Sequence, residues 1–155
     1  MAQNPLAAVV AENPSNVLKL LKVDANGNLI VANSGAVPDG AVSITASSGN
    51  EANTNAVATL AAATGKTTYI TGFTCTAAGA TAAAVVEVTV VGLIGGTATY
   101  IFVAPAGATV AANTLNVQFP VAIPASAADT AIVVTLPALG AGNTNAAVVA
   151  TGYQL

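Results

Sequence analysis

The sequence predicts an all-β protein whose main domain is a jelly-roll-like sandwich of two antiparallel sheets. Apolar and polar residues alternate with a period of two along several segments, and turn-forming residues separate those segments. Eight such segments follow one another at the spacing typical of sandwiches and barrels. An immunoglobulin-like sandwich is the alternative fold, although the chain has one Cys and no Trp and so lacks its usual Cys–Trp–Cys core.

The centre of the predicted domain is a hairpin over residues 82–103. Val86 and Val88 flank Glu87, so the valines share one face of a strand and Glu87 lies on the other. Three glycines then predict a reversal, because glycine tolerates the positive φ that tight turns need. The return strand, residues 97–103, is apolar or only mildly polar on both faces. This pattern predicts a strand that is covered on both sides.

The other strands are predicted from the same alternation. They cover residues 41–46, 55–62, 67–75, 115–123, 130–136 and 145–153. Pro120 and Pro124 lie on one side of their segment, which indicates an edge strand or a bend. The Ala-rich segments 56–63 and 77–84 are predicted as strand and loop, because Thr, Val and Gly interrupt them.

The composition changes near residue 40, where we predict a domain boundary. Residues 36–40, AVPDG, have turn-forming composition. Residues 1–40 are predicted to form an N-terminal extended arm, and residues 41–155 form the β-sandwich domain.

Two kinds of local structure are predicted within the arm. Each of two Asn-Pro pairs places a good N-cap residue before a proline suited to a first helical turn, which predicts short turns over residues 6–12 and 15–21. Residues 18–23 can instead lead into a small β-hairpin that returns over 29–31. The Asn26-Gly27 pair between them is a strong signal for a type I′ turn.

Low charge is the strongest compositional signal about function. Charged residues make up 6% of the chain, against about 25% in ordinary soluble domains. With three basic residues and no His, the chain is not expected to bind nucleic acid, which requires cations that neutralise phosphates. Gly, Thr, Asn and Pro interrupt its apolar segments, so no membrane partner is expected either. We expect companions to cover the uncharged β surfaces; the alternative is a soluble monomer with a surface rich in Thr and Asn.

No catalytic, cofactor or metal site is predicted, and the chain is not expected to be an enzyme. Without His, no Ser–His or Cys–His pair exists, and one Cys supplies no zinc set. Cys75 is expected to be a buried free thiol. Glu87 and Asp129 are carboxylates that the fold can bring together in principle, but no sugar-binding groups mark a glycosidase cleft around them.

Two motifs resemble binding loops and fail on their spacing. Thr64-Gly65-Lys66-Thr67 matches the end of a phosphate-binding loop, but Leu60 stands where its first glycine belongs. Asp24, Asn26 and Asn28 have the first ligand spacings of a calcium loop. The Gly and Glu required at its sixth and twelfth positions are absent, so a turn is predicted.

Three stretches resemble small virion proteins of tailed bacteriophages. They are KVDANGNLIVANSG at residues 22–35, GKTTYITGFTCTAAG at 65–79, and the C-terminal TGYQL at 151–155. The resemblance implies a capsid decoration (cement) protein, or a neck, head-fibre or tail component. It also implies a homo-oligomer, such as a trimer, that contacts other virion proteins such as the major capsid protein, with the arm hooked onto a neighbour.

The resemblance further implies a virion protein assembled in the host cytoplasm, which agrees with an N-terminus that lacks the features of a signal peptide. A carbohydrate-binding or adhesion module is the competing hypothesis, because jelly rolls often have that role. Its stacking platforms would have to be Tyr69, Tyr100 and Tyr153.

Overall fold

The computed structural model describes residues 10–11, 19–20, 37–38, 40–80, 82, 84–104, 106, 113–140 and 143–155. The chain forms two compact units, Met1–Ala36 and Val37–Leu155. In the first unit, β1 (Val10–Ala11) pairs antiparallel with β2 (Lys19–Leu20). These four residues are extended and not helical, because a single helical turn has too few hydrogen bonds to offset its nucleation cost. For Lys19–Leu20 this agrees with the alternative prediction of a strand over residues 18–23, although its partner is Val10–Ala11. The rest of both predicted turns, and the Asn26-Gly27 hairpin, lie outside the described residues.

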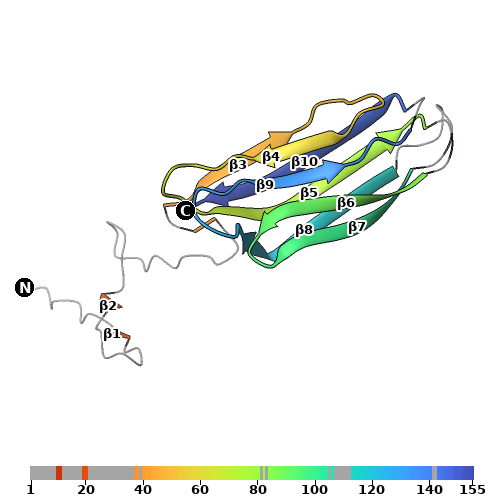
Figure 1. Cartoon of the computed structure of the whole chain (residues 1–155). Helices are drawn as coiled ribbons and strands as arrows, with labels where there is room; N and C mark the ends of the chain where they lie inside the picture. Colours follow the sequence, from red (N-terminus) through yellow and green to blue (C-terminus); the bar gives the residue numbers. More distant parts are fainter. Residues whose placement is uncertain are drawn as a thin grey trace, which may run out of the picture. The chain divides into compact units, whose positions relative to one another are not determined.

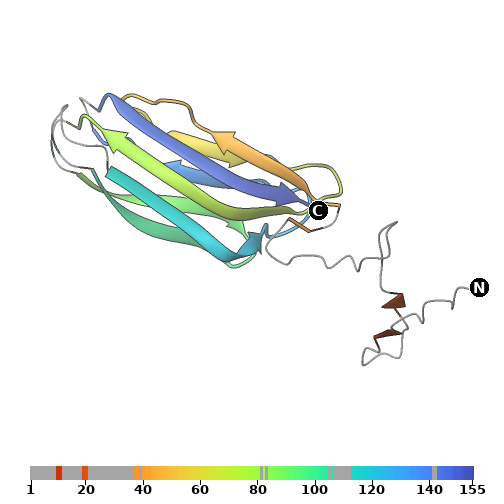
Figure 2. The same ribbon diagram turned by 180° about the vertical axis from the view of Figure 1, so that it is seen from behind.

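The second unit is a sandwich of two four-stranded sheets (Figure 1). Its strands are β3 (Val42–Ser47), β4 (Ala56–Leu60), β5 (Thr68–Ala78), β6 (Ala84–Leu93), β7 (Gly96–Ala104), β8 (Asn113–Pro124), β9 (Ile132–Leu136) and β10 (Asn145–Gln154). One sheet has the order β3-β10-β5-β8 and the other β4-β9-β6-β7, and every pairing in them is antiparallel. Figure 2 shows the first of these sheets from its outer side.

The strand order is that of a jelly roll. The first strand of the sandwich pairs with the last (β3–β10), the second with the seventh (β4–β9), the third with the sixth (β5–β8), and the fourth with the fifth (β6–β7). Such nesting results when one long antiparallel hairpin is wound over a core. The predicted sandwich is therefore confirmed, and its pairing follows the jelly-roll order and not the immunoglobulin-like one.

All eight predicted segments become strands, and the central hairpin has the predicted facing. Val88 and Val90 are fully buried, whereas Glu87 is exposed and lies opposite Ile101 on the return strand. The chain reverses between Leu93 and Gly96, and Gly96 has a φ of 94°. That conformation is easy for glycine and costly for other residues, which explains the glycines at this turn.

The core lies between the two sheets and is built by inward residues from both. Its largest fully buried side chains include aromatic, leucine, isoleucine and valine residues: Phe73, Phe102, Leu60, Ile70, Ile132, Leu136, Val88, Val90, Val134 and Val148. Small alanines occupy other inward positions, such as Ala56 and Ala58 on β4. The alternation read from the sequence therefore corresponds to a real division between core and surface.

Strand β7 departs from its prediction. The sequence predicted a return strand covered on both faces, but β7 is an edge strand with only one face on the core. Phe102 is buried, while Ile101 and Val103 on either side of it are exposed. The apolar outer face of β7 therefore does not reflect a second covering layer among the described residues.

Cys75 is a fully buried free thiol on β5, as predicted. Burial raises its pKa from 9.0 to about 12, because desolvation disfavours the thiolate.

We expect the folded protein to react with a disulfide reagent far more slowly than the urea-unfolded chain at about pH 8, since the thiolate is the reactive species. Absorbance of the released thiolate measures both rates; equal rates would contradict the burial.

The same shift predicts a dependence of stability on pH. Below the ordinary pKa of 9.0 the thiol is protonated in both states, and between 9.0 and about 12 the unfolded chain loses its proton first. The free energy of unfolding should therefore fall in this range, and less so in Cys75→Ala, whose other titrating groups are the same.

Candidate interaction surface

The loop that resembles a phosphate-binding motif is held by a carboxylate. The Gly65 N–H donates to Asp129 Oδ1 at 2.7 Å, and the Asp129 N–H donates to the Lys66 carbonyl at 3.0 Å. Strand β5 follows this loop, where a phosphate site requires a helix. The loop therefore joins two turns of the sandwich and presents its N–H groups to the protein itself.

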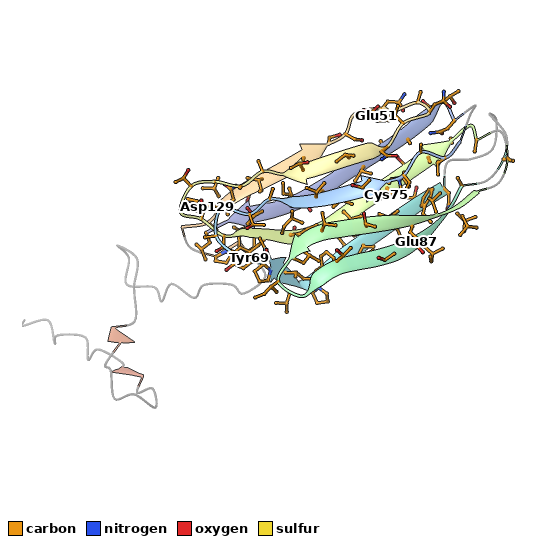
Figure 3. All side chains as sticks on the ribbon, in the orientation of Figure 1. Glu51, Tyr69, Cys75, Glu87 and Asp129 are labelled. Carbon is orange, nitrogen blue, oxygen red and sulfur yellow. The ribbon has the colours of Figure 1, made fainter. Side chains whose placement is uncertain are left out.

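The two candidate acidic partners do not meet. Figure 3 shows Glu87 and Asp129 toward opposite ends of the sandwich. Among the residues that the structure describes, no group of three or more His, Cys, Asp or Glu side chains is placed to hold a metal ion. The calcium-like residues Asp24, Asn26 and Asn28 lie outside the described residues.

The three tyrosines do not form an open stacking platform. Tyr69 and Tyr153 are paired across neighbouring strands and stack on each other, with ring centroids 4.8 Å apart and planes at 16°. Tyr153 is buried, and desolvation, followed by the nearby Tyr69, raises the pKa of its hydroxyl. Tyr100 packs against the Phe73 ring inside the sandwich, at 5.2 Å and 69°. Tyr69 and Tyr153 thus cover one face of each other's rings, and Tyr100 faces the core.

A hollow of about 70 Å³ lies beside β5 and β10, lined by Asn50, Thr76, Ala77, Ala78, Asn145, Ala146 and Ala147. Pockets for small molecules enclose about 300–1,000 Å³. The hollow is therefore too small for such a ligand.

Ionised side chains are almost absent from those surfaces. Residues 40–155 contain four charged residues, Glu51, Lys66, Glu87 and Asp129. Only Glu87 lies within one of the eight strands. The two outer faces of the sandwich therefore consist almost entirely of uncharged side chains. The kind of uncharged side chain differs between the two faces.

The outer face of the β3-β10-β5-β8 sheet carries hydroxyl and amide groups, and we call it the hydroxyl face. Its outward residues include Ser43, Thr45, Ser47, Thr74, Thr76, Thr114, Asn116, Gln118 and Thr151. Several of these groups bond to one another or to the backbone: Thr71 Oγ1 donates to the Thr151 carbonyl at 3.0 Å, and Gln118 Nε2 to Asn116 Oδ1 at 3.1 Å. Such a face is solvated without ionised side chains.

The outer face of the β4-β9-β6-β7 sheet is different, and we call it the valine–threonine face. Its outward residues are Val57, Thr59, Val85, Glu87, Thr89, Val91, Thr97, Thr99, Ile101, Val103, Val133 and Thr135. All of them except Glu87 are β-branched. The result is a sheet surface of stiff, short side chains, to which a flat partner can approach closely.

Exposed apolar side chains concentrate where this face reaches strand β7. Val85 and Val103 are cross-strand partners and are 69% and 48% exposed, and Ile101 beside them is 60% exposed. Ile94 in the β6–β7 turn and Val121 on β8 are also strongly exposed. Contiguous exposed apolar groups of this kind mark interaction sites more often than isolated ones do. The sequence contains this signal in the apolar outer face of residues 97–103, which by itself also fits a strand packed inside the chain.

Comparison with protein-family models, with curated proteins and with solved structures finds no match for this chain. In the part of the chain that the structure describes, no helix has the length and hydropathy needed to cross a bilayer.

Proposed function

We propose that this chain is a non-enzymatic structural subunit of a tailed-phage particle, most simply a capsid decoration or cement protein. The observation that carries the proposal is the valine–threonine face, where Glu87 is the one ionised side chain on a sheet of β-branched residues. A free surface of this kind invites edge-to-edge or face-to-face association. A subunit that is permanently packed against neighbours has no need of charged residues there.

The division of the chain into two units supports a role for the arm. Met1–Ala36 is a unit distinct from the sandwich. It carries Glu12, Lys19, Lys22 and Asp24, four of the nine charged residues of the chain. In this proposal the sandwich supplies the uncharged faces, and the arm attaches the subunit to another virion protein such as the major capsid protein. The subunit then assembles in the host cytoplasm and resides in the virion.

Deletion of residues 2–35 tests this division of roles. We expect the shortened chain to keep a cooperative unfolding transition, since the core residues all belong to the second unit. We expect it to lose its place in particles, since the arm makes the attachment. Sucrose-gradient sedimentation of a lysate from cells that produce the particle, probed with an antibody to the sandwich, measures both chains.

The intact chain should sediment with shell-sized particles, and the shortened chain should stay near the top of the gradient. Full incorporation of the shortened chain would remove the arm from the mechanism. An intact chain found only as a free protein would contradict the structural role itself. A neck, head-fibre or tail position predicts co-sedimentation with a different fraction, of tails or connectors.

A carbohydrate-binding module is the weaker proposal. The mutual stacking of Tyr69 and Tyr153 and the inward packing of Tyr100 leave it without the aromatic platforms that it needs. A glycan array on which the intact chain gives reproducible hits would revive it.

A further inference from the structure

Strand β7 is an edge of the valine–threonine sheet, and in the described part of the chain its pairing with β6 is interrupted once, by a register shift near its N-terminal end. It is nine residues long, GTATYIFVA, and contains no charged residue and no proline. Proteins normally prevent edge-to-edge pairing with Lys, Pro, bulges or very short edge strands. An edge of this length without charge or proline favours pairing with another strand.

The other three sheet edges of the sandwich are shorter than β7 or carry proline. Strands β4 and β3 are short, with five and six residues. Strand β8 is long but carries Pro120 and Pro124, which lack the N–H that a pairing strand needs. Strand β7 is therefore where pairing is expected.

We propose that β7 pairs antiparallel with β7 of a second copy of the chain, about a two-fold axis. The proposal rests on the proposed structural role and names the surface through which copies associate. A strand edge is complementary to itself when reversed, because its outward N–H and C=O groups alternate in the same order in both copies. The two β4-β9-β6-β7 sheets then join into one continuous sheet.

The position of Glu87 favours edge pairing over the stacking of two valine–threonine faces. A face-on copy buries Glu87 against a surface without cations. Lys66, the lysine of the sandwich, lies next to Asp129, which Figure 3 places toward the opposite end from Glu87. Burial of an unpaired carboxylate costs several kcal/mol. Edge pairing leaves Glu87 in water, because it lies on β6, one strand inside the edge.

Edge pairing also adds a neighbour to apolar side chains on β7 itself, whereas Val85 on β6 stays exposed. Ile101 on β7 gains a cross-strand neighbour from the second copy, and such pairs of β-branched residues stabilise a sheet. Val103 lies at the limit of this contact, because the Asn113 side chain donates a hydrogen bond to its carbonyl. Asn113 thus occupies the C-terminal end of the edge.

The register that pairs the most residues places the axis at the midpoint of the free part of the edge. With the Val103 carbonyl occupied, the free part of the edge is residues 96–102, and its midpoint is Thr99. Thr99 should therefore lie opposite Thr99 of the second copy, with Cβ atoms about 4.5–5.5 Å apart. Its side chain is exposed on the valine–threonine face, so substitutions there do not disturb the core.

Sedimentation equilibrium of the intact chain and of two matched variants tests the proposal. Thr99→Lys places two ammonium groups opposite each other at the axis and should raise the dissociation constant of the dimer by about tenfold or more. Thr135→Lys makes the same chemical change on the same face, but on β9, two strands inside the edge. It should leave the dissociation constant nearly unchanged, and thermal unfolding verifies that both variants are folded.

A second measurement does not depend on a loss of binding. Oxidation of Thr99→Cys should give a covalent dimer, whereas Thr135→Cys should not, and the buried Cys75 contributes nothing to either. A monomeric intact chain, equal weakening by both lysine variants, or a dimer without the Thr99→Cys cross-link would each overturn the edge pairing. An isolated three-fold ring would do the same, since a two-fold contact builds dimers or dihedral assemblies.

These outcomes are separate from those of the proposed function. A chain that is monomeric in solution but sediments with phage particles overturns the edge pairing and leaves the structural role intact. A dimer of the Thr99→Cys variant that is cross-linked but never enters a particle supports the edge pairing and overturns the structural role.

Discussion

Replacement of Phe73 by alanine is expected to destabilise the sandwich by about 3–5 kcal/mol. Phe73 is fully buried on β5, in the middle of one sheet. Its ring meets Tyr100 of the opposite sheet edge-on at 5.2 Å and lies 6.4 Å from Phe119 of the neighbouring strand. The substitution therefore removes apolar area that connects both sheets and leaves a cavity, which rigid sheets fill poorly.

Urea unfolding followed by circular dichroism measures the loss, and Phe119→Ala is the matched control. Phe119 is only partly buried and packs at the margin of the core. The same chemical change should cost clearly less there, because less apolar area is lost and the site can relax toward solvent. Equal losses of stability at the two positions would show that Phe73 is no more important to the packing of the core than Phe119.

Substitution of Gly152 by alanine is the second large effect that we expect. A Cβ atom at this position would lie 2.0 Å from the Tyr69 carbonyl oxygen and 3.1 Å from Leu60 Cδ1. The register of β10 against β5 shifts beside Gly152, and this brings the two backbones close together. A backbone oxygen cannot rotate away as a side chain can, so the ladder itself must move. Overpacking of this kind costs about 1–3 kcal/mol or more.

Gly95→Ala is the matched control for this prediction, measured by the same unfolding assay. Gly95 lies in the β6–β7 turn, and a Cβ atom there meets nothing within 4 Å. It also has no positive φ. Its replacement should change stability by less than about 1 kcal/mol. A Gly152→Ala protein as stable as the Gly95→Ala protein would contradict the close approach of β10 to β5.

At the candidate surface, the sequence pattern predicts the facing of β6 but not that of β7. The alternation of Val86, Glu87 and Val88 correctly placed Glu87 outside and the valines inside. Residues 97–103 gave no such division, because Ile101 and Val103 are as apolar as Phe102 between them. A strand that is apolar on both faces is predicted to be covered on both, but the pattern does not say whether its own chain or another chain would provide the cover.

The sequence alone determined the class of the fold and the places of all eight strands of the sandwich, because both depend on the local alternation of apolar residues and on turn chemistry. It also predicted the burial of Cys75, because free cysteines are usually buried. Only the tertiary structure decided which strands are neighbours, which of them end as edges, and that Glu87 and Asp129 stay apart. Strand order depends on pairings between residues distant in the chain, such as β3 with β10, and these are selected by the packing of both sheets on one core. For the same reason, the exposure of β7 became visible only once the two sheets were assembled.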